Sequence, residues 1–349
     1  MQVILKTKVS LLFVCLTLIS NVLFTLPARA DEKPGTLVIV DTALNSDQIE
    51  YSKNVIYEVC ILEWYSCPNG SNFMEGKGSA FLQNSFIQDN GFNHGTQMVS
   101  AAVRTNPDLQ IIFIRMVANS NSGARLNVSP LTVAKVFKWV SDNKTKFNIQ
   151  AIAMSQGHHN LSSLTRYCPS DYSTEAMVTQ LRKQGVLLFV PAGNGRDYER
   201  LDWPACIPDA VSIGALNPNK EIASYSNLDQ KLIDYFELGT LTVKDVSGYE
   251  RVAEGTSVAV QIAAAKWMQF IGYYANLSTE DRLQEFDRFA RPVTSTKFSN
   301  GKAFPDKIEN PEVKIYLETE YKSEIESIKS QLAELRDLIE LLIAALKIH

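Results

Sequence analysis

The chain has 349 residues, with 34 lysines and arginines against 38 aspartates and glutamates, so its formal net charge is −4. This mild acidity, without basic clusters, argues against a nucleic-acid-binding protein. Hydrophobic residues make up 45% of the chain, as in ordinary globular proteins, and the length suffices for one large α/β domain with an appendage.

Residues 1–30 have the features of a signal peptide. Lys6 and Lys8 form a basic start, residues 9–26 are apolar, and Ala28-Arg29-Ala30 matches a small-x-small cleavage site. A retained membrane anchor is the alternative, which the nearby cleavage signal disfavours. We therefore expect an exported protein, either periplasmic or extracellular.

Four cysteines remain beyond the leader, an even number that favours disulfides in an exported chain. Three pairings are possible. We favour Cys60–Cys67 because they are close in sequence, and Cys168–Cys206 because both follow strands that should end at one face. A zinc site is the alternative, but the usual ligand spacings are absent and export disfavours it. No pattern indicates a cofactor.

Apolar runs alternate with helical patterns along the chain, which predicts βαβ units and a mostly parallel sheet. Residues 43–91, rich in Ser, Asn and Gly, are expected to form an irregular insertion. Adjacent His158 and His159 suit a solvated loop better than a metal site. The expected strands are 36–41, 109–117, 149–154 and 186–190, and the expected helices are 130–142, 174–184 and 258–275.

Four polar residues lie where these elements begin or end. Asp41 ends the first strand, His94 begins a helical pattern, Asn194 follows a buried strand, and Ser257 begins an apolar helix. Free N–H groups at a helix start favour an anion, so a serine there can attack a carbonyl near donors for the oxyanion. The alternative for each residue is structural, as a cap or turn residue. Parallel sheets bind ligands at the carboxyl ends of strands, where Asp41, Ser155 and Asn194 are expected.

The order Asp41, His94, Asn194, Ser257 resembles that of the subtilisin-like serine proteases (subtilases, peptidase family S8). The matching motifs are Val-Asp-Thr, His-Gly-Thr, Ala-Gly-Asn and Gly-Thr-Ser-x-Ala, and the resemblance covers about residues 37–267. It implies a three-layer αβα domain and a serine endopeptidase without a cofactor. In that reading Ser257 is the nucleophile, His94 the general base and Asp41 its orienting partner, while Asn194 helps to bind the oxyanion.

The resemblance also implies how a polypeptide substrate binds. Ser155, Gln156 and Gly157 would pair with the extended substrate and form one wall of the specificity pocket, and Ala192 and Gly193 would form part of the other. A catalytically impaired scaffold acting as an oligomeric binding protein is the alternative, although all four catalytic residue types are present. An α/β-hydrolase would need Gly-x-Ser-x-Gly, which does not occur.

The sequence departs from the family pattern at three positions. Ala43 and Ser100 replace usual glycines, and Gln261 replaces a usual proline. These changes alter local backbone geometry without removing a group that does chemistry. The few residues between Ala30 and the first strand leave no room for an N-terminal prosegment, so we expect unaided folding or help from the C-terminal extension.

The C-terminal part is expected to be separate from the protease domain, which we place at 31–290. Pro292, Pro305 and Pro311 predict a linker over 291–313. Residues 314–349 predict a coiled-coil helix, and 316–347 should hold a homo-oligomer of two to four chains, with fold-back onto the domain as the alternative. The heptad positions are Ile325, Ile328, Leu332, Leu335, Ile339, Leu342 and Leu346.

Overall fold

The computed structural model describes residues 35–308, except 46, 48–49, 65, 83–90, 158–167, 169–171 and 296–297. The predicted signal peptide, both adjacent histidines and the predicted coiled coil lie outside the described residues. In the part of the chain that is described, no helix is both long and apolar enough to cross a bilayer.

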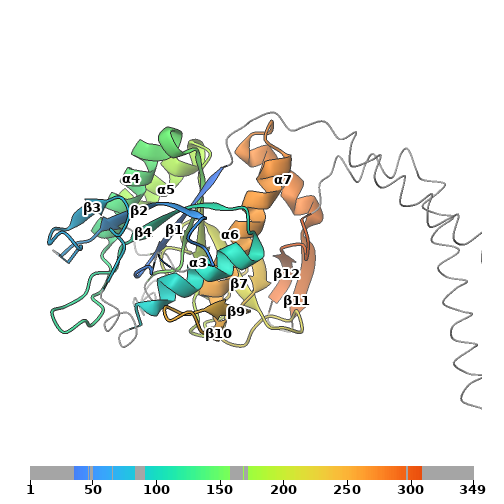
Figure 1. The fold of residues 1–349 in the computed structure, drawn as a ribbon. Coiled ribbons are helices and arrows are strands. Elements are labelled where there is room, and N and C mark those ends of the chain that lie inside the picture. Colours follow the sequence, from blue (N-terminus) through green and yellow to red (C-terminus); the bar gives the residue numbers. More distant parts are fainter. Residues whose placement is uncertain are drawn as a thin grey trace, which may run out of the picture. The chain divides into compact units, whose positions relative to one another are not determined.

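A ten-stranded sheet runs through the domain (Figure 1). In spatial order its strands are β11 (Arg291–Ser295), β12 (Phe298–Ala303), β8 (Tyr235–Leu238), β7 (Val211–Leu216), β6 (Leu187–Pro191), β5 (Ile149–Met154), β1 (Thr36–Asp41), β4 (Gln110–Arg115), β2 (Val55–Ile61) and β3 (Phe73–Glu75). The strands from β12 to β2 run parallel, and antiparallel β11 and β3 form the two edges. The predicted, mostly parallel α/β sheet is therefore confirmed. A separate hairpin consists of β9 (Thr240–Lys244) and β10 (Glu250–Glu254).

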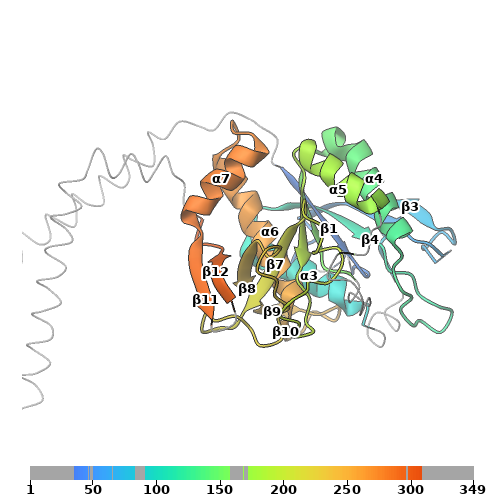
Figure 2. The same cartoon turned by 180° about the vertical axis from the view of Figure 1, so that it is seen from behind.

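Helices cover both faces of the sheet (Figures 1 and 2). One face carries α4 (Pro130–Phe147) and α5 (Tyr172–Lys183), and the other carries α3 (Asn93–Thr105), α6 (Thr256–Tyr273) and α7 (Thr279–Phe289). Because side chains alternate along a strand, both faces of this buried sheet must be apolar. The continuous apolar runs in the sequence meet that requirement.

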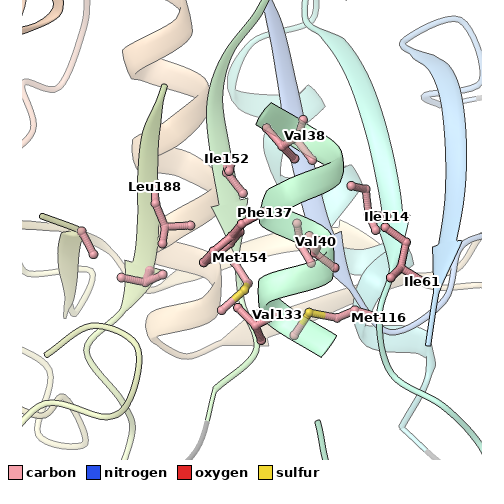
Figure 3. Close-up of a cluster of buried hydrophobic side chains, with 14 of the residues drawn as sticks. Val38, Val40, Ile61, Ile114, Met116, Val133, Phe137, Ile152, Met154 and Leu188 are labelled. Atoms are coloured by element: carbon pink, nitrogen blue, oxygen red, sulfur yellow. The ribbon is translucent and has the colours of Figure 1, made fainter. Parts of the chain in front are cut away.

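Strand β1 shows this division clearly. Its Val38 and Val40, with Ile152 of β5, pack towards Val133 and Phe137 of α4 (Figure 3). The intervening residues of β1 face the other layer, where α6 is buried on nearly every side. The central position of α6 agrees with its uniformly apolar sequence.

Two segments expected to be irregular are in fact strands. The insertion 43–91 contains β2, which pairs in parallel with β4, and β3. Its strand signal is the run of β-branched and aromatic residues from Val55, which the polar composition around it concealed.

The predicted linker 291–313 likewise begins with β11 and β12, so the sheet extends beyond residue 290. Pro292 is compatible with a strand because β11 is an edge strand and needs no N–H on its outer side. Val293 and Phe298 pack on Phe236 of β8. These buried contacts make the segment part of the domain core.

Both predicted disulfides are present. Cys60, at the end of β2, is bonded to Cys67, and Cys168 is bonded to Cys206 across 38 residues. The second bond joins the segment after β5 to the segment after β6. Neighbouring parallel strands end at the same edge of a sheet, which explains why these two distant cysteines meet.

Strand β1 lies at the point where the chain changes direction across the sheet. From β1 the chain builds β2 and β4 on one side, and then crosses to build β5 on the other. The segments after β4 and β5 therefore leave the sheet on opposite sides of the end of β1. Such a switch point is where open α/β sheets form a binding crevice, and Asp41 is the last residue of β1.

Candidate active site

Asp41 and His94 form a hydrogen-bonded pair at this crevice. His94 Nδ1 lies 2.8 Å from Oδ1 and 3.0 Å from Oδ2 of Asp41, whose carboxylate is completely buried. A carboxylate only accepts hydrogen bonds, so Nδ1 carries a proton and Nε2 of the neutral ring is left as an acceptor. The His94 side chain is 27% exposed, so the pair joins a buried anion to a ring that reaches solvent.

The start of α3 is tied to β1 by Thr42. Its hydroxyl donates to the Phe92 carbonyl oxygen at 2.8 Å and accepts from the Gly95 N–H at 2.9 Å. Phe92 is the N-cap of α3 and provides no side-chain cap, so Thr42 supplies the missing acceptor from another element. This places His94, the second residue of the helix, beside Asp41.

Gly95 permits the close approach of α3 to β1. A Cβ at this position would lie 2.4 Å from the Ala43 carbonyl oxygen and 2.8 Å from the Phe113 ring. No side chain fits there without moving the helix. The glycine in the His-Gly-Thr sequence is therefore a packing requirement of the same site.

The start of α6 carries Ser257 and is held by Asn194. The Asn194 Oδ1 atom accepts hydrogen bonds from the backbone N–H and the hydroxyl of Thr256, both at 2.9 Å. With Oδ1 occupied, the amide orientation is set and Nδ2 is the group available to a ligand. Ser257 is the second residue of α6; of the N–H groups beside it, that of Thr256 donates to Asn194 and that of Val258 donates to the Gly255 carbonyl oxygen at 3.1 Å.

Helices α3 and α6 pack together close to these residues. Met98, one turn after His94, forms a cluster with Val258 and Ile262 of α6. This packing brings His94 and Ser257 to neighbouring helix ends. Among the described residues no hydrogen bond joins His94 to the Ser257 hydroxyl, which agrees with the long contacts often found in such pairs before substrate binds.

The loop that carries Asn194 is fixed by polar contacts. Asn227 Oδ1 accepts from the N–H groups of Gly195 at 2.8 Å and Asp197 at 3.0 Å. Gly193 has a φ of +109°, and a Cβ there would meet Asp202 and Asn227 at 2.3 Å. The loop conformation thus depends on glycine and on a dense polar network beneath it.

The segment after β5 contacts both halves of the site. Ser155 Oγ donates to the Ser257 carbonyl oxygen at 3.1 Å and accepts from Gln261 Nε2 at 2.9 Å. Gln156 Nε2 lies 3.0 Å from Asp41 Oδ1. Gln261, noted in the sequence only as a replacement for proline, therefore links α6 to the end of β5.

The five predicted substrate-binding residues differ in accessibility. Ser155, Gln156, Ala192 and Gly193 are buried, and Gly157 is exposed. Ala192 is completely buried, so its side chain belongs to the core. Substrate binding by this group stays a prediction, with Gly157 the accessible member.

Three contributors to the site were not identified from the sequence as such: Thr42, Gln261 and Arg125. Arg125 Nη2 donates to Gln156 Oε1 at 2.7 Å. Thr42 directly follows Asp41, which is a usable signal. The roles of Gln261 and Arg125 arise from side chains that meet across the fold, and no local pattern predicts them.

Arg115 is a second cation beside the site. It is the residue of β4 paired with Asp41, and it is completely buried. Burial lowers the pKa of its guanidinium to about 10. The group therefore stays charged at neutral pH, and it donates to the Phe81 carbonyl oxygen at 2.9 Å and to Asn119 Oδ1 at 2.6 Å.

The Tyr225 hydroxyl lies beside Gly239, whose carbonyl oxygen also accepts the N–H of Gly255, two residues before Ser257. Burial, and then the neighbouring carboxylate of Glu254, raise the pKa of its phenol to about 12. The neutral hydroxyl donates to the Gly239 carbonyl oxygen at 3.2 Å. Within the described residues, no group of three or more His, Cys, Asp or Glu side chains is placed to hold a metal ion.

Curated serine proteases are similar to part of this chain in sequence. No family model matches the chain. A cuticle-degrading serine protease of Arthrobotrys oligospora is 26% identical over 176 residues, covering 48% of this chain and 39% of the relative. A subtilase-type proteinase of Schizosaccharomyces pombe is 23% identical over 251 residues, covering 70% of this chain and 48% of the relative. The chain therefore spans less than half the length of these relatives.

Solved structures show the same fold. A psychrophilic protease matches with a TM-score of 0.59 and 19% identity, covering 78% of this chain and 92% of its own. A cold-adapted subtilisin-like serine proteinase matches with a TM-score of 0.59 and 17% identity, covering 81% and 95%. The described chain thus has the subtilisin-like α/β fold.

The Thr42 hydroxyl provides a test of how α3 is attached. Thr42→Val keeps the shape but leaves the Phe92 carbonyl and the Gly95 N–H without their partner, so the free energy of unfolding should fall by about 1–3 kcal/mol. Thr42→Ser keeps the hydroxyl, so its free energy of unfolding should fall clearly less than that of Thr42→Val. Urea unfolding of both variants measures this, and equal losses would contradict the assigned hydrogen bonds.

Proposed function

We propose that this chain is an exported serine endopeptidase that hydrolyses peptide bonds with Ser257 as nucleophile. The observation that carries the proposal is the hydrogen bond between His94 and the buried carboxylate of Asp41. It leaves His94 Nε2 as a base at the helix end that adjoins Ser257. The subtilisin-like fold and the serine proteases among the relatives support the same reaction class.

In the proposed reaction, Ser257 Oγ bonds to the carbonyl carbon of the substrate while its proton passes to His94 Nε2. The charged imidazole that results is stabilised by Asp41. His94 then gives this proton to the leaving amine as the carbon–nitrogen bond breaks, which leaves an acyl ester on Ser257. A water molecule then bonds to the acyl carbon while one of its protons passes to His94 Nε2; as the bond from this carbon to Ser257 Oγ breaks, His94 returns the proton to Oγ and the acid product leaves.

The developing oxyanion would be bound by Asn194 Nδ2 and the Ser257 N–H. Asn194 suits this role because Thr256 occupies its Oδ1 atom, which leaves Nδ2 as the group that can donate to a ligand. Donors fixed before the reaction stabilise the transition state without reorganisation. The buried network around Asn227 holds the loop in place for that purpose.

The substrate would be a polypeptide bound along Ser155–Gly157, with Gly157 as the accessible contact. Export is supported by the leader sequence and by two disulfides, which persist in oxidising compartments. The cuticle-degrading activity in the name of one relative belongs to that relative. A catalytically impaired, oligomeric scaffold is the competing function, and labelling of Ser257 separates the two.

The first test of the function is covalent labelling. A fluorophosphonate should form an adduct on Ser257 of the wild type, identified by peptide mass spectrometry. Ser257→Ala should abolish labelling and lower peptide hydrolysis by up to about 10⁶-fold, the loss that subtilisin shows for its own serine. His94→Ala should have nearly the same effect, because the two residues act together.

Ser141→Ala, on the remote helix α4, is the matched control and should keep full activity. All variants should remain folded, which thermal unfolding verifies. A well-folded wild type that takes no label, or an active Ser257→Ala, would exclude the proposed nucleophile and favour the scaffold.

Asn194 allows a separate test of the oxyanion site. Asn194→Ala should lower kcat by about 10²–10³-fold, the loss that subtilisin shows for its oxyanion asparagine, with little change in KM. Asn194→Asp keeps an acceptor for Thr256 and replaces only the donor with an anion, so its kcat should fall at least as far as that of Asn194→Ala. Steady-state kinetics of these variants with one peptide substrate measures both constants. An effect confined to KM would refute the role of Asn194 as an oxyanion donor.

We also propose that residues 316–347 join two to four chains, because their heptad pattern would otherwise expose an apolar stripe. Light scattering should show an oligomer for the full chain and a monomer for a chain ending at Ile308. A monomer in both cases would favour fold-back of the helix onto its own domain.

A further inference from the structure

The side-chain amide of Gln156 is held between an anion and a cation. Its Nε2 atom lies 3.0 Å from Asp41 Oδ1, and its Oε1 atom lies 2.7 Å from Arg125 Nη2. Gln156 is 8% exposed, so the amide is largely removed from water. None of the catalytic steps proposed above makes use of this contact.

The two neighbours leave the amide only one orientation. Arg125 offers donors alone, so it must face Oε1, and the carboxylate of Asp41 offers acceptors alone, so it must face the NH₂ group. A rotated amide would place an oxygen against the carboxylate and an NH₂ group against the guanidinium. Arg125 therefore determines that Gln156 donates to Asp41.

Three donors converge on one oxygen of Asp41. Besides Gln156 Nε2, Oδ1 receives the Thr42 N–H at 2.6 Å and His94 Nδ1 at 2.8 Å. Gln156 Nε2 and His94 Nδ1 are 3.4 Å apart, and since both are donors they meet at a shared acceptor rather than bonding to each other. A buried carboxylate needs such donors, and here they also fix the plane in which it meets the imidazole.

The contact also joins the two sides of the crevice. Arg125 comes from the segment after β4 and Gln156 from the segment after β5, so they meet over the end of β1 between them. Arg125 is held by a β-bridge to Asn119 and by the Leu126 N–H, which donates to the Ala118 carbonyl oxygen at 2.9 Å. Its side chain packs above Gly91, just before α3 begins.

We propose that Gln156 and Arg125 are a positioning pair for catalysis: Arg125 orients the amide of Gln156, and this amide holds Asp41 in place for His94. The inference rests on the proposed protease function. Neither residue touches the reacting atoms. Their effect belongs to the step in which His94 becomes charged, because only then does the geometry of Asp41 stabilise a cation.

Kinetics of four variants test the pair. Gln156→Met has similar length without a donor, and kcat should fall about tenfold with little change in KM, the scale of one lost hydrogen bond to a charged group. Arg125→Lys keeps a cationic donor and should stay within about threefold of the wild type. Arg125→Met frees the amide and should give an intermediate loss of kcat.

Arg125→Glu gives the sharpest prediction. The carboxylate of the introduced glutamate accepts a hydrogen bond from the Gln156 NH₂ group. This turns the Gln156 amide oxygen towards Asp41, so kcat should fall further than in Arg125→Met. Arg288→Met and Arg288→Glu change the charge equally at an exposed site on α7 and should keep full activity. If Arg125 only bound substrate, its variants would change KM instead, and that result would overturn the proposal.

A second measurement does not depend on turnover. The chain has four histidines, so ¹⁵N-histidine labelling can resolve the Nδ1 proton that His94 shares with Asp41, with His94→Ala for assignment. In a Ser257→Ala background this proton should be observed, and it should exchange faster in Gln156→Met and Arg125→Glu. Arg125→Lys and Arg288→Glu should leave it unchanged.

The two readouts separate the possible failures. An unchanged proton signal in Gln156→Met overturns the positioning role, whether or not kcat falls. If the wild type neither labels nor cleaves peptide while the signal responds as expected, the protease function is wrong and the positioning pair is supported. Thermal unfolding verifies that each variant is folded. Because Arg125 is exposed, its substitutions do not disturb the core.

Discussion

The buried carboxylate of Asp41 is the constraint on which the rest of the site depends. An anion removed from water is costly unless donors surround it, and this one receives hydrogen bonds from Thr42, His94 and Gln156. Each donor comes from a different segment. Satisfying one charge therefore positions the end of β1, the start of α3 and the segment after β5 relative to one another.

The sheet explains why these segments can meet. Its parallel strands place their carboxyl ends at one edge, and the reversal of direction at β1 separates the segments after β4 and β5. Helices α3 and α6 then approach that edge with their N-terminal turns, held together by Met98, Val258 and Ile262. The proposed catalytic site therefore lies at a crevice that the strand order of the sheet creates by itself.

Polar side chains act here mainly as connections between elements. Thr42 replaces the missing cap of α3, Asn194 holds the start of α6, and Gln261 joins α6 to Ser155. Each of these contacts gives a partner to a polar group of the backbone or of a side chain. Where the resembled family has a proline, Gln261 provides such a link, so this departure in sequence corresponds to a different but well-defined contact.

The sequence alone determined the parallel α/β class and the order of the four candidate catalytic residues, because these depend on local patterns: apolar runs, helix starts and short motifs. It also favoured the two disulfides among three possible pairings, and the structure confirmed them. It failed for β2 and for β11 and β12, whose strands are stabilised by neighbours distant in the chain while their composition suggests loops. It placed Gln156 in a wall of the substrate site, which stays a prediction, and it gave no role to the Gln156 amide. Only the tertiary structure decided that its amide faces Asp41, because that orientation is imposed by Arg125, 31 residues away, through a contact that no local pattern encodes.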